Sequence, residues 1–363
     1  MTTAPNTLGH GGNPASEFER LGLSPRPVTD FSVNLSPLGV PASLRSAMPV
    51  ILETLERYPT IFGDGVAAYY RERFGLDSRC VLPTNGASQA IYLALDALGG
   101  ESVAILSPTF SEYERAAAAA GKSVLHVSLS ETDGFSPPDV DALIDAMGDA
   151  DCLVLCNPNN PTGTRWSAEA LLNLSERCPN KLFIIDESFV QFLDDEGAIS
   201  LLRMSHLRPN LVIVHSLTKL YAVAGLRLGA VVAHPTFIGR LKTSIPPWSV
   251  NALAEAAASF LAESTAYEDA VRRSVSGERA RMLSELADIA GISLHDTGVN
   301  FLLAKWTKTP SLDDLLRALL MQGIYVRDCR NFRGLEDNWF RFAVLLPQEN
   351  ERLIGALKAA ANG

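Results

Sequence analysis

The sequence lacks the features that mark secreted, membrane-spanning or metal-binding proteins. Its five cysteines are an odd number and form no CxxC pair, which argues against a disulfide framework and against a zinc site. No apolar run reaches the length of a membrane span, and the first twenty residues do not have the charged-then-apolar layout of a signal peptide. We therefore expect no metal, no membrane association and a cytoplasmic location.

Basic residues are also scarce. Lys and Arg number 31 against 41 Asp and Glu, so the formal net charge is −10. A nucleic-acid partner is disfavoured because binding to a phosphate backbone needs a basic surface. Hydrophobic residues make up 47% and charged residues 20%, which is ordinary for a globular protein, and 363 residues are enough for two domains.

Short apolar runs alternate with segments of helical periodicity through the middle of the chain. This alternation favours a mostly parallel sheet covered by helices on both faces, the α/β class. Ligands of such sheets collect at the carboxyl ends of the strands. The runs that we predict to be strands are residues 103–106, 124–129, 152–156, 182–185, 211–214 and 228–232.

We predict three regions along the chain. Residues 1–43 are rich in Gly, Pro, Ser and Asn without a clear period, which is typical of an arm lying on the body. Residues 44–255 contain the alternating pattern and predict a large domain. Residues 256–363 predict a smaller α+β domain, with strands at 301–306, 324–327 and 339–345 and a helix at 312–321.

The stretch LVIVHSLTKLYAVAGLRLG, residues 211–229, carries the strongest chemical signal. Its apolar start predicts a buried strand that ends at Ser216, Thr218 and Lys219. A lysine beside apolar strands is costly to charge, because desolvation disfavours the ammonium form, and such lysines often form Schiff bases. The two hydroxyls and Arg227 are suited to hold an anion. Pyridoxal phosphate needs both an amine that can bond to its aldehyde and a binding site for its phosphate. A solvated loop lysine explains this stretch alone equally well.

Two other strand ends carry polar residues of the kinds that this cofactor needs. Gly86, Ala87 and Ser88 open a helix directly after a strand, so free backbone amides and the helix dipole favour a phosphate there. An ordinary Asn-Gly turn is the alternative. Asp186 follows the apolar run LFII, and a buried carboxylate needs a cation or donor such as a protonated pyridine nitrogen. A structural salt bridge or a helix cap is the alternative for Asp186.

The loop CNPNNPTG, residues 156–163, is too rich in Asn and Pro to be strand or helix. The amide of Asn160 is suited to donate to the phenolate oxygen of the cofactor. Phe110 follows a Ser-Pro-Thr turn and is a candidate to stack on the ring, with Tyr113 as the other candidate. An aromatic residue in this place is also compatible with simple core packing.

Together these motifs resemble a known family. SLTK with GLRLG, NPNNPTG, DES and NGASQ occur in the order and spacing of fold-type-I pyridoxal-phosphate enzymes, close to histidinol-phosphate aminotransferases. HGGN, FSVNLSPLG, ERYP, PPWSVNALA and RDCRNFRGLEDNWFRFAV are more similar to the threonine-O-3-phosphate decarboxylases of cobalamin biosynthesis. This resemblance covers nearly the whole chain and implies the fold-type-I architecture and a homodimer.

The resemblance also implies roles for the matching residues. Lys219 would hold pyridoxal phosphate as a Schiff base. Asn160 and Asp186 would polarise the cofactor ring, and Phe110 would stack on it. The phosphate of the cofactor would be bound by Gly86, Ala87, Ser88, Ser216, Arg227 and, from the neighbouring subunit, Tyr58.

For the substrate, the resemblance implies that Arg341 grips the carboxylate as a bidentate fork, a geometry that lysine cannot reproduce. Asn160 would also face the substrate. The far end of the site would take a phosphate on the substrate and would be lined by His10, Gly11, Asn34 and Arg327.

The implied reaction is decarboxylation of O-phospho-L-threonine, or of a related compound such as O-phosphoserine, to the amine phosphate. Three departures bear on this expectation. Phe189 stands where aminotransferases usually carry tyrosine. The segment after Arg341 lacks the small polar residues that are typical of aminotransferases. Ser36 stands where the decarboxylases often have asparagine. A histidinol-phosphate-type aminotransferase is the alternative enzyme. A regulatory module without turnover is a third possibility, but such modules usually carry a basic DNA-binding domain.

Overall fold

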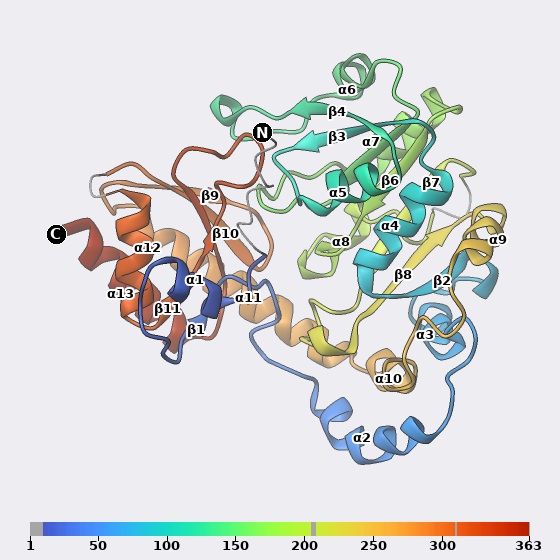
Figure 1. The fold of residues 1–363 in the computed structure, drawn as a ribbon, viewed down its shortest axis with the longest axis horizontal. Helices are drawn as coiled ribbons and strands as arrows, with labels where there is room; N and C mark the ends of the chain where they lie inside the picture. The colour runs from blue at the N-terminus through green and yellow to red at the C-terminus, as the bar shows by residue number, and fades with distance from the viewer. Residues whose placement is uncertain (1–9, 205–207, 309–310, 363) are drawn as a thin grey trace.

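A seven-stranded sheet forms the centre of the larger part of the molecule (Figure 1). The computed structural model describes residues 10–204, 208–308 and 311–362. Strand β8 is antiparallel to both of its neighbours, β2 and β7, whereas the remaining pairs are parallel. In spatial order the strands are β2 (Val81–Asn85), β8 (Leu228–Ala233), β7 (Leu211–Ser216), β6 (Leu182–Asp186), β5 (Cys152–Cys156), β3 (Ser102–Ser107) and β4 (Ser123–Ser128). The predicted mostly parallel α/β sheet is confirmed.

Helices cover both faces of this sheet because successive buried side chains of each strand point to opposite sides. Val154, Ile184 and Val214 pack on one face under α4 (Gly86–Leu98), α5 (Glu112–Ala119) and α9 (Pro235–Ser244). Leu155 and Ile185 pack on the other face. The same core includes residues of α3 (Asp64–Phe74), α6 (Val140–Met147), α7 (Ala168–Arg177) and α10 (Ala252–Ala262), and α2 (Ala42–Leu52) packs against α10.

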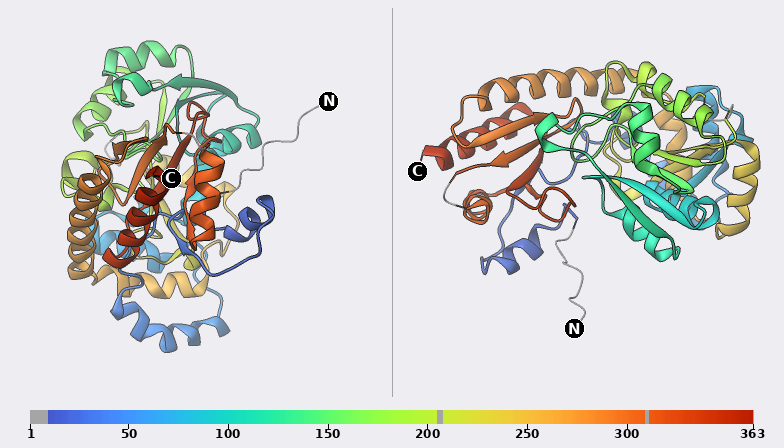
Figure 2. Two further views of the ribbon diagram at one scale, coloured as in Figure 1. Left: turned by 90° about the vertical axis from the view of Figure 1, so that its left-hand side faces the viewer. Right: turned by 90° about the horizontal axis from the view of Figure 1, so that it is seen from above.

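A smaller antiparallel sheet has its own apolar core. Its order is β12 (Arg327–Asp328), β13 (Trp339–Ala343), β10 (Phe301–Trp306) and β9 (Ile292–Asp296), and α12 (Leu312–Met321) and α13 (Pro347–Asn362) pack on it. Helix α11 (Thr265–Leu286) joins the two parts, as Figure 2 shows in orange. Its Val271 and Val275 belong to the large core, whereas its Met282 and Leu286 belong to the small one.

The described part of the predicted arm lies against the smaller part of the molecule as far as Phe31, and the Ser36 N–H then donates to the Lys219 carbonyl at 2.9 Å. The arm contains α1 (Pro14–Arg20) and β1 (Thr29–Asp30), which pairs in parallel with β11 (Ile324–Tyr325). Phe31 is fully buried in the small core. The first nine residues of the predicted arm lie outside the described residues. The predicted division at residues 255 and 256 stays a prediction, and α10 spans it.

Two features of the sequence-based prediction need correction. The single strand predicted at 324–327 is two short strands, β11 and β12, because they pair with different partners, β1 and β13. We also did not predict α1, α6, α9, α13 and β9, which are short or begin at a proline. Within the described ranges, no helix is both long and apolar enough to cross a membrane.

Gly163 provides a test of how the two parts fit together. Its φ is +72°, and a Cβ at this position would lie 2.2 Å from the Cα of Thr297, between β9 and β10. We predict that Gly163→Ala lowers the free energy of unfolding by about 1–3 kcal/mol, because backbone on both sides must shift. The measurement is urea unfolding. Gly197→Ala is the control, since a Cβ at Gly197 meets nothing within 4 Å. Equal stability of both variants would contradict this packing.

Candidate active site

The carboxyl ends of β5, β6 and β7 form one wall of a cavity. Because side chains alternate along a strand, Cys156, Asp186 and Ser216 point to the same face as the apolar residues under α4. Helix α4 begins at Gly86, so its amino terminus opens on this cavity. The cavity is lined by Ala87, Ser88, Ile91, Phe110, Tyr113, Cys156, Asn160, Asp186, Ser188, Phe189, Ser216, Thr218, Lys219 and Arg227. Most of the residues predicted to bind the cofactor therefore lie together.

Lys219 is half-buried at the centre of this arrangement. Burial lowers the pKa of its amine to about 8, and the positive charges of Arg341 and Arg227 act in the same direction. The nearby carboxylate of Asp186 opposes the shift. At pH 7 about a tenth of the Lys219 side chains are therefore neutral, compared with roughly one in a few thousand for an ordinary lysine. A neutral amine is the form that attacks an aldehyde.

Asp186 is a buried carboxylate held by two neutral donors. The backbone N–H of Ser188 donates to Oδ1 at 2.9 Å, and the Tyr113 hydroxyl donates to Oδ2 at 2.8 Å. Burial raises the pKa of Asp186, while these two hydrogen bonds and Lys219 oppose the rise. Among the described residues, no Arg, Lys or His forms an ion pair with it. A protonated pyridine nitrogen fits such a carboxylate, because a buried charge needs a partner.

The backbone around Gly86 leaves no room for side chains. Gly86 has φ +77°, and a Cβ there would lie 2.7 Å from Arg227 Nη2. A Cβ on Gly229 would lie 2.6 Å from the backbone nitrogen of Ala87. This close packing holds the start of α4 and the Arg227 guanidinium side by side, which suits a phosphate. The Thr218 hydroxyl donates to the Leu228 carbonyl at 3.2 Å and serves the backbone instead.

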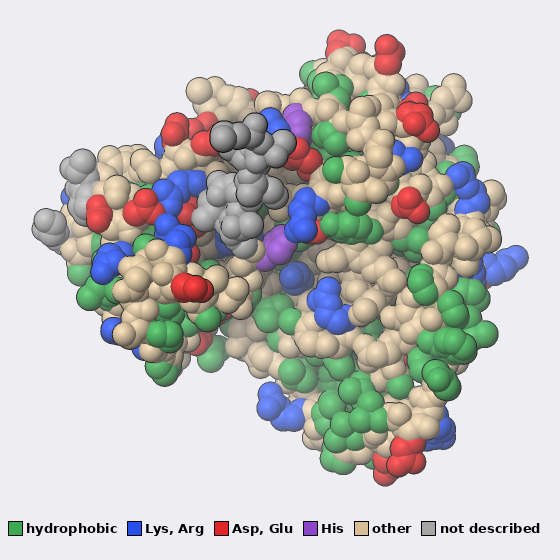
Figure 3. Space-filling view, viewed as in Figure 1, with side chains coloured by type: hydrophobic (Ala, Val, Ile, Leu, Met, Phe, Trp, Pro, Cys, Tyr) green, Lys and Arg blue, Asp and Glu red, His purple; other side chains and the backbone are tan. Residues whose placement is uncertain are grey.

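A second cavity adjoins the first and shares five residues with it: Ser88, Phe110, Asn160, Phe189 and Lys219. All the residues predicted for substrate binding line this second cavity, namely His10, Gly11, Asn34, Asn160, Arg327 and Arg341. Figure 3 shows Lys, Arg and His side chains gathered at the centre of one face, between the two parts of the molecule. The sequence therefore predicted both sets of residues, although their individual roles stay predictions.

Arg341 is the most deeply buried cation of the second cavity. Its Nη2 donates to the Ser32 carbonyl at 2.8 Å and its Nη1 donates to Asn160 Oδ1, while its buried Nε has no partner. Burial lowers its pKa to about 10, so the guanidinium stays charged at neutral pH. No carboxylate pairs with it in the part of the chain that the structure describes. Such a cation fits an anionic ligand.

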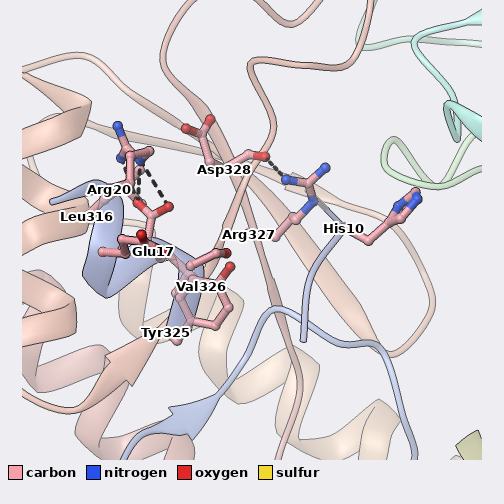
Figure 4. A pocket seen from close by; sticks show the side chains of 10 residues that line it. His10, Glu17, Arg20, Leu316, Tyr325, Val326, Arg327 and Asp328 are labelled. Atoms are coloured by element: carbon pink, nitrogen blue, oxygen red, sulfur yellow. Dashed lines mark hydrogen bonds and ion pairs between the residues drawn. The ribbon is translucent and has the colours of Figure 1, made fainter. Parts of the chain in front are cut away.

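Arg327 separates the second cavity from a third one (Figure 4). Its Nη1 donates to the Asp328 carbonyl at 2.7 Å, its Nη2 donates to Asn331 Oδ1 at 2.8 Å, and its guanidinium lies 5.4 Å from the ring centre of Phe332. Figure 4 shows Arg327 and His10 beside this third cavity, where Arg20 pairs with Glu17. Among the residues that line the second and third cavities, only His10 and Arg327 line both.

Tyr58 lies outside these cavities. Its side chain is 83% exposed, and its ring centre is 5.1 Å from that of Trp248. The role predicted for Tyr58 concerns a neighbouring subunit, so it stays a prediction.

Sequence reasoning missed three contacts in the site. Tyr113 was a candidate to stack on a ring, but its hydroxyl bonds to Asp186 and its ring packs edge-on against Phe110. The Ser32 carbonyl accepts a hydrogen bond from Arg341, and Glu112, in the wall of the second cavity, accepts one from His10. The first contact joins residues 73 positions apart. The other two bring together segments that are distant in the sequence, which no local pattern indicates.

The model of the aminotransferase class I and II family matches residues 26–357. The chain therefore belongs to this family, whose cofactor is pyridoxal phosphate, and the buried amine, carboxylate and phosphate cradle fit that cofactor.

Three relatives refine the comparison. The chain is similar to threonine-phosphate decarboxylase of Salmonella typhimurium, with 34% identity over 98% of this chain and 97% of that protein. It is 29% identical to the adenosylcobalamin biosynthesis bifunctional protein CobDQ of Leptospira interrogans, over 96% of this chain and 40% of that protein. The crystal structure of histidinol-phosphate aminotransferase from Clostridium acetobutylicum superposes with a TM-score of 0.85 at 29% identity and covers 92% of this chain and 98% of that one.

The lowered pKa of Lys219 gives a pH prediction. We expect covalent labelling of Lys219 by pyridoxal phosphate and borohydride to rise with pH and to reach half its maximum near pH 8, because deprotonation exposes the reactive amine. Peptide mass spectrometry measures the labelling at each pH. Exposed lysines serve as the internal control and should need a pH about two units higher. A common midpoint for all lysines would contradict the burial argument.

Proposed function

We propose that this enzyme is a pyridoxal-phosphate-dependent carbon–carbon lyase. It decarboxylates O-phospho-L-threonine, or a related phosphorylated amino acid such as O-phosphoserine, to the amine phosphate, for the side chain of cobalamin. The observation that carries this proposal is the joining of two cavities at Lys219 and Asn160. One fits the cofactor, and the other presents Arg341, Arg327 and His10 to a substrate with two anionic groups.

In this proposal each residue of the first cavity has a defined task. Lys219 Nζ would bind the aldehyde group, and the Asp186 carboxylate would pair with the ring nitrogen. The Asn160 amide nitrogen would donate to the ring oxygen, because Arg341 already occupies its Oδ1. The phosphate would be bound by Ser88, Ser216, Arg227 and the backbone at Gly86 and Ala87, and Phe110 would stack on the ring. When bound, pyridoxal phosphate supplies an electron sink for the pair left behind by the departing carboxylate.

Arg341 determines which bond of the substrate breaks. Two parallel N–H donors of a guanidinium fix both oxygens of a carboxylate and therefore its rotation about the Cα–C bond. The deeply buried position of Arg341 keeps water away from that carboxylate, so the guanidinium sets its orientation. Lys219 Nζ, with its pKa near neutrality, then delivers a proton to Cα. Carbon dioxide and the amine phosphate leave.

Histidinol-phosphate-type transamination is the second candidate, supported by the structural similarity to such an aminotransferase. In that reaction the substrate carboxylate stays in place and Lys219 Nζ removes the proton from Cα. Phe189 supports decarboxylation, because it lines both cavities with a ring that lacks the usual tyrosine hydroxyl. It packs edge-on against Phe301, with ring centres 5.3 Å apart.

We further propose that the enzyme is a homodimer in the cytoplasm, as the resemblance to biosynthetic decarboxylases implies. Tyr58 would then reach the cofactor phosphate of the neighbouring subunit. Support comes from a group of exposed apolar side chains around it, which a second subunit would cover: Val50, Leu52, Leu55, Ile61 and Trp248.

The two candidate reactions differ in their need for an amino acceptor. We expect the protein, supplied with pyridoxal phosphate and O-phospho-L-threonine, to release carbon dioxide without any keto acid. The measurement is carbon dioxide release with and without 2-oxoglutarate, together with identification of the amine phosphate by mass spectrometry. A product that forms only with 2-oxoglutarate would replace decarboxylation by transamination.

Replacing Arg341 by lysine tests the substrate carboxylate site. We predict that Arg341→Lys lowers kcat/KM by about 100-fold or more, because lysine keeps one charge but loses the bidentate geometry. The affinity for pyridoxal phosphate should change far less, because Arg341 lines the second cavity and not the first. Arg333→Lys is the matched control, since Arg333 is exposed. Equal loss of cofactor affinity and activity would move Arg341 out of the substrate site.

A further inference from the structure

Glu112 is a carboxylate in the wall of a cavity that otherwise suits anions. It is the first residue of α5, is 8% exposed, and lines the second cavity with Arg327 and Arg341. Its Oε1 accepts from His10 Nε2 at 2.9 Å and from Arg115 Nη1 at 2.7 Å, and its Oε2 accepts from the Tyr92 hydroxyl at 2.9 Å. Neither cofactor binding nor decarboxylation assigns a task to this side chain.

The bond to His10 connects the arm with the large sheet. The arm is fixed next to His10, because the Gly12 N–H donates to Ser32 Oγ at 2.8 Å and a Cβ on Gly11 would lie 2.4 Å from the Ser32 carbonyl oxygen. Two residues before Ser32, strand β1 ends at Asp30, and this strand pairs with β11. His10 and Glu112 are 102 residues apart in the sequence, and both line the second cavity.

The three donors of Glu112 are not equivalent. Tyr92 and Arg115 come from α4 and α5, the helices that already hold Glu112, whereas His10 comes from the arm and is half exposed. If His10 turned to another acceptor, Glu112 would still accept from Arg115 and Tyr92. A buried carboxylate would therefore not be left without partners.

We propose that Glu112 is a positioning residue that acts as a stand-in for the phosphate of the substrate. In the free enzyme its carboxylate holds His10 over the cavity, and when a phosphorylated amino acid binds, His10 transfers its hydrogen bond from Glu112 to a phosphate oxygen. On binding, one charge-assisted hydrogen bond replaces another. Because the bond to Glu112 already orders the arm in the free enzyme, substrate binding does not have to order it. This inference rests on the proposed function only in requiring a phosphate at the far end of the substrate.

Hydrogen–deuterium exchange of the arm in the full-length holoenzyme tests the proposal. Glu112→Gln removes the negative charge and leaves a single acceptor oxygen for the donors that now share two. We expect the amides of residues 10–20 to exchange about fivefold faster in the free variant than in the wild type, because the bond to His10 loses its ionic partner. With saturating 1-amino-2-propanol O-phosphate, which has no carboxylate to lose, the two proteins should exchange equally. Glu114→Gln is the control, because Glu114 pairs with His126 and Arg333 instead.

His10→Ala provides a second variant, located in the arm where it does not disturb the core. It should speed exchange in the free enzyme as Glu112→Gln does, but the amine phosphate should not restore protection, because no imidazole remains to take the phosphate. Unchanged exchange in free Glu112→Gln, or a difference that persists with the amine phosphate bound, would overturn the proposal. The comparison of free proteins needs no turnover, so it remains decisive if O-phospho-L-threonine proves not to be decarboxylated.

Discussion

Two oppositely charged groups, the amine of Lys219 and the carboxylate of Asp186, are placed where the sheet excludes water. Burial disfavours the charged form of each, so the pKa of Lys219 falls and the pKa of Asp186 rises. Neutral donors hold the Asp186 carboxylate, whereas the positive charges of Arg341 and Arg227 lower the pKa of the Lys219 amine further, to about 8. A ligand with an aldehyde and a protonated ring nitrogen satisfies both groups at once.

The strand alternation explains why these groups meet. Cys156, Asp186 and Ser216 end three neighbouring strands on the same face, and α4 begins beside them. The arm and the small sheet then add Ser32 and Arg341 from the opposite side. The cofactor cavity is therefore built by local strand and helix signals, whereas the substrate cavity is built where two separately packed parts of the molecule meet.

That difference decides what the sequence could predict. The hydrophobic periodicity of strands and helices indicated the sheet. The polar residues at the strand ends indicated the positions of Lys219, Asp186 and Asn160. The family resemblance added Arg341 and His10, which hydrophobic periodicity does not identify. The contact between Glu112 and His10 and the bond from Arg341 to Ser32 depend on long-range packing, and nothing in their local sequence predicts them. The split of one predicted strand into β11 and β12 has the same origin, because each half pairs with a distant partner.

One fold accommodates both decarboxylases and aminotransferases, so the reaction follows from how a substrate is held and not from the sheet. In both proposed reactions the Lys219 amine would first bind the cofactor covalently. The most direct measurement is the visible absorbance of the purified protein after saturation with pyridoxal phosphate, beside Lys219→Ala. The account predicts a yellow protein and a variant without that band. A wild-type protein that stays colourless, or a variant with an unchanged band, would contradict it.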